Sequence, residues 1–77
     1  MTVTVLTGRW AAGFVSDWRK EMSVALKDGV TAADLIAHLN IPADEAGVVS
    51  INGRAAAREH VLRDGDNVKL FPAIIGG

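Results

Sequence analysis

Few side chains in this sequence could carry out chemistry. There is no cysteine, which excludes a thiol nucleophile, a disulfide framework and a thiolate metal site. His38 and His60 lie far apart without companion ligands, and both are expected at the surface. Asp64 and Asp66 flank a glycine, but a calcium loop needs more oxygen ligands, so the pair predicts a turn whose carboxylates bond nearby backbone. No nucleophile with a matching base and no phosphate-binding loop is recognisable, which makes an independent enzyme the least favoured class.

The remaining reactive group is the carboxylate at the end of the chain, which closes with Gly76-Gly77. Taken alone, two terminal glycines indicate little, because most chain ends are frayed. Pro72 cannot donate to a sheet ladder, so it is expected to mark the point where the sheet gives way to a tail. We therefore predict a folded domain of residues 1–72 and a flexible tail of residues 73–77, with the Gly77 carboxylate as its reactive end.

Composition restricts the functional classes further. The chain has 77 residues, enough for one small domain, and 49% of them are apolar, which favours a compact core over disorder. The formal net charge is −1 and no basic block is present, which argues against nucleic acid as a partner. The first residues contain neither a positive stretch nor a long apolar run, so we expect no signal peptide, no membrane contact and a cytoplasmic protein.

Periodicity predicts the elements that must position this tail. Alternating or β-branched stretches predict strands, and one apolar stripe at helical spacing predicts a helix that starts after Thr31. The strands are expected at residues 2–6, 21–27, 48–51, 54–57 and 67–71, and the helix at residues 32–39. The order β, β, α, β, short β, β predicts an α+β fold in which four or five strands form one mixed sheet with the helix packed across it.

Local signals fix the ends of these elements. Thr31 is a good helix N-cap, and Asp34 three residues later completes a capping box with a shorter acid. Asn40 can close the helix, and a proline two residues later prevents its resumption. The Asn52-Gly53 pair is a strong signal for a tight hairpin, and the aspartates around Gly65 lead into the last strand.

Two groups of side chains allow two interpretations each. Aromatic residues recur every four positions at Trp10, Phe14 and Trp18, as on one helical face, but Gly13 weakens such a helix. A loop that packs these rings on the sheet is favoured over a binding surface. Four cationic residues can form a rim for an acidic partner, although scattered solvated charges explain them equally well: Arg54, Arg58, Arg63 and Lys69.

Four segments together resemble a known family. They are the helix of residues 31–39, the Val49-Ser50-Ile51-Asn52-Gly53-Arg54 segment, the Leu62-Arg63-Asp64-Gly65-Asp66-Asn67-Val68 segment and the terminal run Leu70-Phe71-Pro72-Ala73-Ile74-Ile75-Gly76-Gly77. In these, the chain resembles the β-grasp (ubiquitin-like) sulfur carriers represented by ThiS and MoaD. The resemblance covers nearly everything from Glu21 onward. It implies the β-grasp version of the predicted α+β fold.

The resemblance implies a mechanism for the tail. A ubiquitin-activating-type adenylyltransferase uses ATP to adenylate the Gly77 carboxylate, which gives a poor acyl donor a good leaving group. A sulfur donor of the cysteine desulfurase or rhodanese type then converts the acyl-adenylate to a thiocarboxylate. An acceptor enzyme, the molybdopterin synthase large subunit or a thiazole synthase, takes the sulfur. The chain itself is expected to bind no cofactor and no metal. Two glycines without side chains suit a tail that enters a narrow tunnel.

The resemblance divides between two branches of the family. Phe71-Pro72 looks like the small subunit of molybdopterin synthase, whereas residues 51–53 and 57–60 look more like the thiamine thiazole carrier. Chain length favours the molybdopterin branch slightly. A ubiquitin-like modifier, joined through Gly77 to lysines of target proteins, is the alternative, and a permanent subunit of molybdopterin synthase is a third possibility.

Apolar residues before the glycines predict a docking patch. Ile74 and Ile75 are expected mostly at an interface, because such an apolar tail is costly to leave in water. For Phe71, both a core position and an interface position are expected, and Pro72 is expected to belong to the same partner-binding surface.

Overall fold

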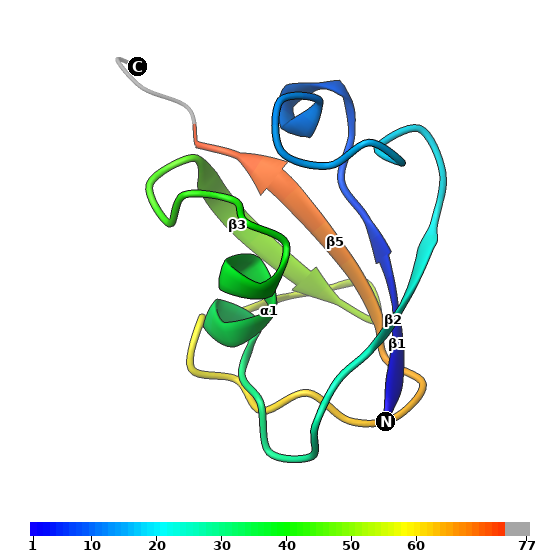
Figure 1. Cartoon of the computed structure of the whole chain (residues 1–77). Helices are drawn as coiled ribbons and strands as arrows, with labels where there is room; N and C mark the ends of the chain where they lie inside the picture. Colours follow the sequence, from blue (N-terminus) through cyan, green and yellow to red (C-terminus); the bar gives the residue numbers. More distant parts are fainter. Residues whose placement is uncertain (74–77) are drawn as a thin grey trace.

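The computed structural model describes residues 1–73, which form one sheet and one α-helix (Figure 1). The elements in chain order are β1 (Thr2–Leu6), the 3-10 turn η1 (Arg9–Ala11), β2 (Met22–Ala25), α1 (Ala32–His38), β3 (Ala46–Ile51), β4 (Arg54–Ala56) and β5 (Asn67–Pro72). All five expected strands and the helix are present. The second and fourth strands are shorter than predicted, and the third and last strands are longer.

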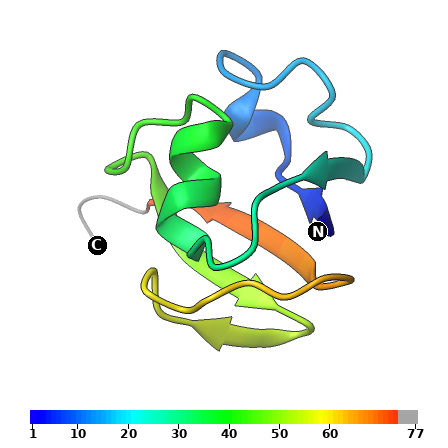
Figure 2. The same cartoon turned by 60° about the horizontal axis from the view of Figure 1, so that its bottom comes forward.

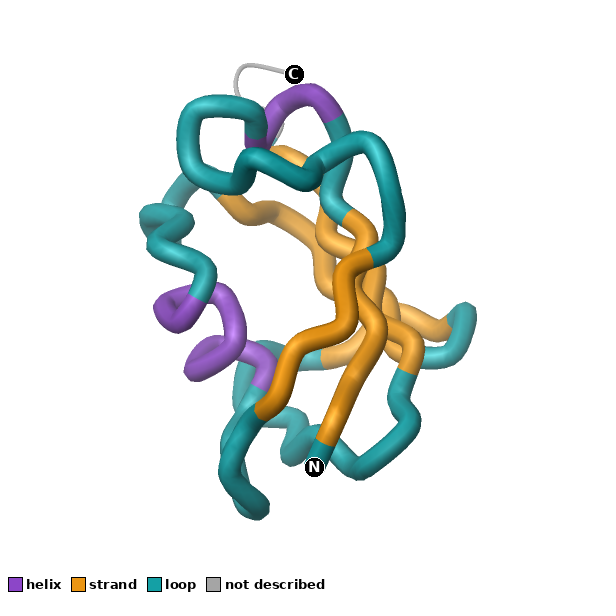
Figure 3. The backbone as a smooth tube through the Cα atoms, turned by 45° about the vertical axis from the view of Figure 1, so that its right-hand side comes forward, coloured by secondary structure: helices purple, strands orange, loops and turns teal. Residues whose placement is uncertain are grey.

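The five strands form one mixed sheet in the order β2-β1-β5-β3-β4. β1 and β5 are parallel at its centre, and the remaining neighbours are antiparallel. Figure 3, which views the sheet from another side, shows α1 on one side of it. This arrangement confirms the predicted α+β architecture with a single helix across a mixed sheet.

The helix begins and ends where its sequence signals predict. The Thr31 hydroxyl accepts a hydrogen bond from the Asp34 N–H (3.2 Å), and the Thr31 N–H donates to the Asp34 carboxylate (2.8 Å), which completes the capping box. Asn40 has a φ of 61°, the left-handed conformation that closes a helix. Among residues 1–73, no helix has the length and apolar character that a bilayer crossing requires.

Alternate residues of the central strands divide between two faces. Val49, Ile51, Val68 and Leu70 point toward α1 and are buried, with Leu70 fully inaccessible to solvent. They pack with Val3 and Val5 of β1, the helix stripe and Leu62 into one cluster. Val24, Leu26 and Met22 are half-buried against this cluster, as the alternation of the second strand predicts. The opposite face of the sheet carries no helix among the described residues (Figure 3).

A hydrogen-bonded network closes the end of the sheet where β5 begins. Asn52 and Gly53 both have positive φ (54° and 85°), as the tight hairpin between β3 and β4 requires. The Asn52 side chain donates to the Asp66 carboxylate (3.0 Å) and accepts from the Asn67 N–H (2.9 Å). The Arg63 N–H also donates to Asp66 (2.8 Å). The predicted hairpin and turn are therefore confirmed, and they are bonded to each other.

The segment after β1 follows a different period from the one its aromatic residues suggest. Ala11 and Val15 are buried, and the Val15 N–H donates to the Ala11 carbonyl (2.8 Å). These small residues therefore face the core. Trp10 packs partly against the core cluster, while Phe14 is exposed and Trp18 is half-buried beneath the Arg19 guanidinium, 4.8 Å from its ring centre. The three aromatic rings do not form one helical face.

Candidate functional site

The predicted tail starts where β5 reaches the edge of the described structure. β5 runs through the middle of the sheet and ends at Pro72, one residue later than predicted (Figure 1). Ile74, Ile75, Gly76 and Gly77 lie outside the described residues, so their predicted roles stay predictions, as does the division into residues 1–72 and 73–77. What the structure gives is the base of the tail and its surroundings.

A β-bulge in β3 holds this base. The register between β3 and β5 pairs Val48 with Phe71 and then Ala46 with Pro72, so Gly47 is the extra residue. Pro72 takes part in the ladder as a register partner, although it has no N–H to donate. The Ala73 N–H donates to the Glu45 carbonyl (3.0 Å), one bond beyond the end of the strand. The last described residues are therefore anchored against the sheet.

Gly47 is where the tail base and β3 come closest. A Cβ at this position would lie 2.7 Å from the Pro72 carbonyl oxygen, 2.8 Å from Ala73 Cα and 3.0 Å from the Ala73 nitrogen. All three are backbone atoms, which cannot rotate away as a flexible side chain can. Only glycine, which has no Cβ, allows the backbone of Pro72 and Ala73 to lie this close to β3.

Beside the tail base lies an exposed apolar pair on the uncovered face of the sheet. Val48 and Phe71 are direct register partners, and 51% and 46% of their respective surfaces are exposed. Leu6 of β1, half-buried, pairs with the exposed Lys69 on the same face. Phe71, which the sequence divided between core and interface, therefore lies at the surface. Its exposure leaves an aromatic ring available next to the base of the tail.

Sequence reasoning missed Val48 and Gly47 as parts of this site. The third strand was expected to begin at Val48, and the bulge before it was not recognised. The burial pattern of β3 explains the omission, because Gly47 and Val48 are both exposed between the buried Ala46 and Val49. Two consecutive exposed residues break the alternation of a regular strand. A glycine within a strand was the one signal that could have indicated the bulge.

The other residues considered for chemistry serve the fold or point elsewhere. Asp64 accepts from the Thr2 N–H (2.7 Å), and Asp66, with 8% of its surface exposed, accepts from Asn52 and Arg63. Both aspartates are turn residues, as predicted. His38 and His60 are exposed. Within residues 1–73, no three side chains of His, Asp or Glu gather closely enough to hold a metal ion.

The four cationic residues of the predicted rim do not share one surface. Arg58 donates to the Ala46 carbonyl, which ties the loop after β4 to β3. Lys69 lies on the uncovered face of the sheet. Arg54 and Arg63 line a groove on another side of the molecule. Of the two interpretations, the single rim is therefore wrong and scattered charges are what the structure shows, with only Arg54 and Arg63 lining one groove.

Comparison with known proteins identifies the fold and the family. Among solved structures, a putative molybdopterin converting factor subunit 1 from Pyrococcus furiosus superposes with a TM-score of 0.74 at 23% identity, covering 96% of this chain and 99% of that one. Small archaeal modifier protein 1 from Haloferax volcanii gives 0.73 at 19% identity, covering 95% and 98%. A chain from the complex of subunits 1 and 2 of the molybdopterin-converting factor from Helicobacter pylori gives a TM-score of 0.60 at 20% identity, covering 100% of both chains.

These likenesses establish the β-grasp fold of ubiquitin-like proteins. A search of curated protein sequences finds no match. The ThiS family model matches residues 13–77, a range that takes in β2 to β5, the bulge at Gly47 and the terminal glycines. The chain therefore belongs to the ThiS family.

Proposed function

We propose that this protein is a sulfur carrier whose Gly77 carboxylate is adenylated by an ATP-dependent activating enzyme and converted to a thiocarboxylate. The thiocarboxylate then donates its sulfur in the biosynthesis of a cofactor. On this proposal the chain is a cosubstrate of other enzymes. ATP is bound by the activating partner, and the protein works in the cytoplasm.

The observation that carries this proposal is the anchored base of the tail beside an exposed apolar pair. The Ala73–Glu45 hydrogen bond and the close crossing at Gly47 fix the point from which residues 74–77 depart. Val48 and Phe71 are exposed directly beside that point. A partner that docks on this pair has the start of the tail at a fixed position relative to its own surface. Fixing the start of a short reactive segment favours its productive orientation.

The chemistry requires no side chain of this protein to act as acid, base or nucleophile. In the first step, a Gly77 carboxylate oxygen bonds to the α-phosphorus of ATP and pyrophosphate leaves. In the second, the outer sulfur of a persulfide donor bonds to the acyl carbon and AMP leaves, which gives an acyl disulfide. A thiol then attacks the donor's sulfur of this S–S bond, so that the thiocarboxylate leaves and the thiol and the donor end as a disulfide. The enzymes that hold ATP and the persulfide supply the catalytic groups. This is consistent with the family match, which extends to the terminal glycine.

Molybdopterin synthesis is the pathway we favour for the acceptor. Phe71-Pro72 carries the resemblance to that branch, and Phe71 is exposed where an acceptor can contact it. The Helicobacter pylori structure, similar in fold, is a complex of subunits 1 and 2 of a molybdopterin-converting factor. On this proposal, an acceptor subunit covers Val48 and Phe71. Thiamine thiazole synthesis is the other pathway within the proposal.

The direct test is an activation assay. The protein is incubated with a cognate activating enzyme and ATP, and the release of pyrophosphate is measured. We expect turnover with the full chain and none after deletion of Gly77 or addition of a residue behind it. Equal turnover of the full chain and the deletion variant would refute the proposed role of the carboxylate.

A ubiquitin-like modifier is the second candidate, supported by the likeness to small archaeal modifier protein 1. Its activation step is the same, but a lysine amine takes the acyl group in place of sulfur. Digestion of cellular protein and mass spectrometry distinguish the two. Lysines that carry a remnant of the Gly76-Gly77 terminus would indicate a modifier, and a free thiocarboxylate would indicate a carrier.

A further inference from the structure

A groove lies beside β4, away from the base of the tail. It has a volume of about 570 Å³ and lies between β4 and the loop that leads to β5. Figure 2 shows these two segments side by side along the lower edge of the molecule. The residues that line it are Ile51, Asn52, Arg54, Ala55, Ala56, Ala57, His60, Arg63 and Asp66. Its size is within the range of about 300–1,000 Å³ that is typical of ligand sites.

The two walls of the groove are held in place independently of any ligand. β4 is paired to β3 through the Asn52-Gly53 hairpin. The opposite loop is bonded to the start of α1, because the Ala32 N–H donates to the His60 carbonyl (3.0 Å) and the Leu62 N–H donates to the Val30 carbonyl (2.9 Å). A groove with fixed walls loses little conformational entropy when it is occupied.

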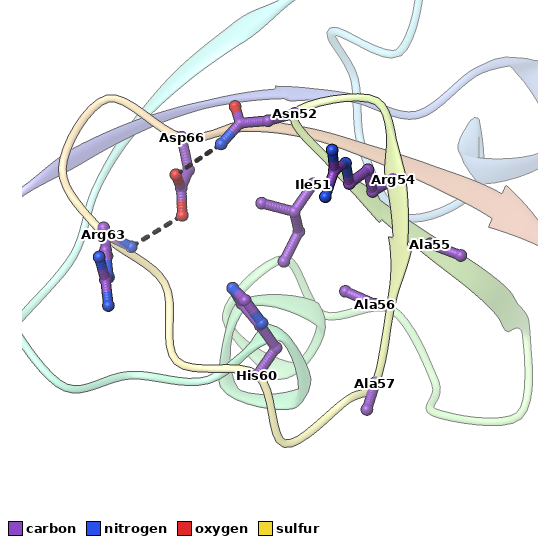
Figure 4. Close-up of a pocket in the computed structure, with 9 residues that line it drawn as sticks. All are labelled: Ile51, Asn52, Arg54, Ala55, Ala56, Ala57, His60, Arg63 and Asp66. Carbon is purple, nitrogen blue, oxygen red and sulfur yellow. Dashed lines mark hydrogen bonds between the residues drawn. The ribbon is translucent and has the colours of Figure 1, made fainter.

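Cationic residues line both walls of the groove. Figure 4 shows Arg54 on the β4 side, Arg63 on the facing loop and His60 directed between them. The one ion pair found among residues 1–73 joins the Met1 ammonium to Asp28, so neither arginine has a carboxylate partner within that range. Asp66, the one acid in the lining, already accepts hydrogen bonds from Asn52 and the Arg63 N–H. The guanidinium groups of Arg54 and Arg63 are therefore available to an external anion.

The bottom of the groove is apolar, and this restricts the kind of anionic ligand that fits it. Ile51 has 6% of its surface exposed there. Directly paired residues of β3 and β4 point to the same face, so Arg54 lies on the face of Ile51 and the half-buried Ala56 on the face of Val49. A single phosphate would satisfy the arginines but leave this apolar surface and most of the volume unfilled. In an extended peptide alternate side chains point the same way, so an apolar residue can contact Ala56 and the exposed part of Ile51 while the acidic residues on either side of it stay at the rim, within reach of the two arginines.

From this charge and shape we propose that the groove docks an extended acidic segment of a protein partner, with two carboxylates bound by Arg54 and Arg63. The groove lies on the α1 side of the sheet, because Arg54 and Ala56 pair with the buried Ile51 and Val49, whereas Val48 and Phe71 lie on the opposite face. Its Asp66 end, which precedes β5, is roughly 20 Å from Pro72 at the rise of a strand, about 3.3 Å per residue. A partner can therefore hold the protein at this groove while the tail and the Val48–Phe71 pair remain accessible.

The test follows backbone amide shifts of the full-length protein during titration with a capped peptide in which glutamate alternates with leucine. We expect the largest shifts at Asn52, Arg54, His60 and Arg63. The affinity should fall as salt is added, because exposed charges are screened within about 10 Å at 0.1 M ionic strength. The same peptide with lysine in place of glutamate should not bind.

Charge-reversal variants assign the site. Arg54→Glu and Arg63→Glu should each weaken peptide binding at least about fivefold, whereas Lys20→Glu, the same change on an exposed loop residue, should alter it less than about twofold. The amide spectrum of each variant reports whether it folds. Arg63→Gln, which removes the charge without introducing a new one, is used if a reversal variant unfolds.

Three results would overturn the proposal. One is a shift pattern that lies outside the groove, for example on the uncovered sheet face. Another is equal weakening by Lys20→Glu, which indicates attraction to overall charge only. The third is inorganic phosphate alone causing the same shifts and displacing the peptide at equal concentration, which indicates a simple anion site.

Discussion

The two faces of the sheet are built from neighbouring residues of the same strands but have opposite surroundings. On the face covered by α1, Leu70 and Val68 are fully buried, and on the other face Phe71 and Val48 are about half exposed. Leu70 and Phe71 differ by one position in β5, and the pleat alone sends them to opposite sides. The buried face stabilises the fold, whereas the exposed apolar pair adds little to it. We infer that the exposed pair is kept for binding.

The largest effect that tests this contrast is expected on the covered face. Leu70→Ala removes a fully buried side chain from the cluster around α1, and we expect a loss of about 2–5 kcal/mol in the free energy of unfolding. Phe71→Ala should cost less than about 1 kcal/mol, because its ring is half exposed. Urea denaturation followed by circular dichroism measures both. Similar losses for the two variants would remove the distinction between the faces.

The next largest effect is expected at Gly47, where the uncovered face meets the base of the tail. Gly47→Ala places a Cβ against the Pro72 carbonyl and Ala73, and we expect a loss of about 1–3 kcal/mol as β5 shifts. The Ala73 amide, bonded to the Glu45 carbonyl, should also exchange its hydrogen faster. Gly13→Ala is the matched control, because a Cβ there meets no atom within 4 Å. Unchanged exchange at Ala73 in the Gly47 variant would contradict the proposed anchoring.

The binding role of the exposed pair is tested with a stable variant. Phe71→Ala should weaken the complex with the activating or acceptor enzyme about tenfold, because truncation of a central aromatic commonly costs more than about 1 kcal/mol of binding. Phe14→Ala removes an aromatic ring of similar exposure from the loop after β1 and should bind normally. Calorimetric titration with the purified partner gives both affinities. Equal affinities for the two variants would place the docking surface elsewhere.

The smallest effect concerns the helix that covers one face. Thr31→Ala removes the hydroxyl that caps α1 and should cost about 1 kcal/mol of stability. Partner binding by the folded protein should be unaffected, because Thr31 begins the helix on the covered face, whereas Val48 and Phe71 lie on the opposite face. Thermal denaturation beside an exposed control, Ser16→Ala, measures the difference. No loss relative to this control would mean that the capping box contributes nothing to stability.

Local chemistry explains which parts of the fold the sequence predicts. The capping box at Thr31, the left-handed Asn40 and the Asn52-Gly53 hairpin each depend on residues within a few positions, and all three are confirmed. The bulge at Gly47 depends on a contact with Pro72 and Ala73, far along the chain, so no local pattern determines it. Lys69 is kept away from the groove by strand register, and Arg58 by its hydrogen bond to the Ala46 carbonyl. Neither can be read from composition. The loop favoured for residues 10–18 is present, but of its three rings only Trp10 packs against the core cluster, because Ala11 and Val15 supply the buried face.

The most direct test of the proposed function is the mass of the intact protein. The full chain is incubated with a cognate activating enzyme, ATP, a persulfide donor and a thiol reductant, beside a variant that lacks Gly77. We predict a mass increase equal to replacement of one oxygen by sulfur, located by fragmentation at Gly77 and absent from the variant. An unchanged mass with an activating enzyme that releases pyrophosphate on the same chain would contradict the sulfur-carrier assignment.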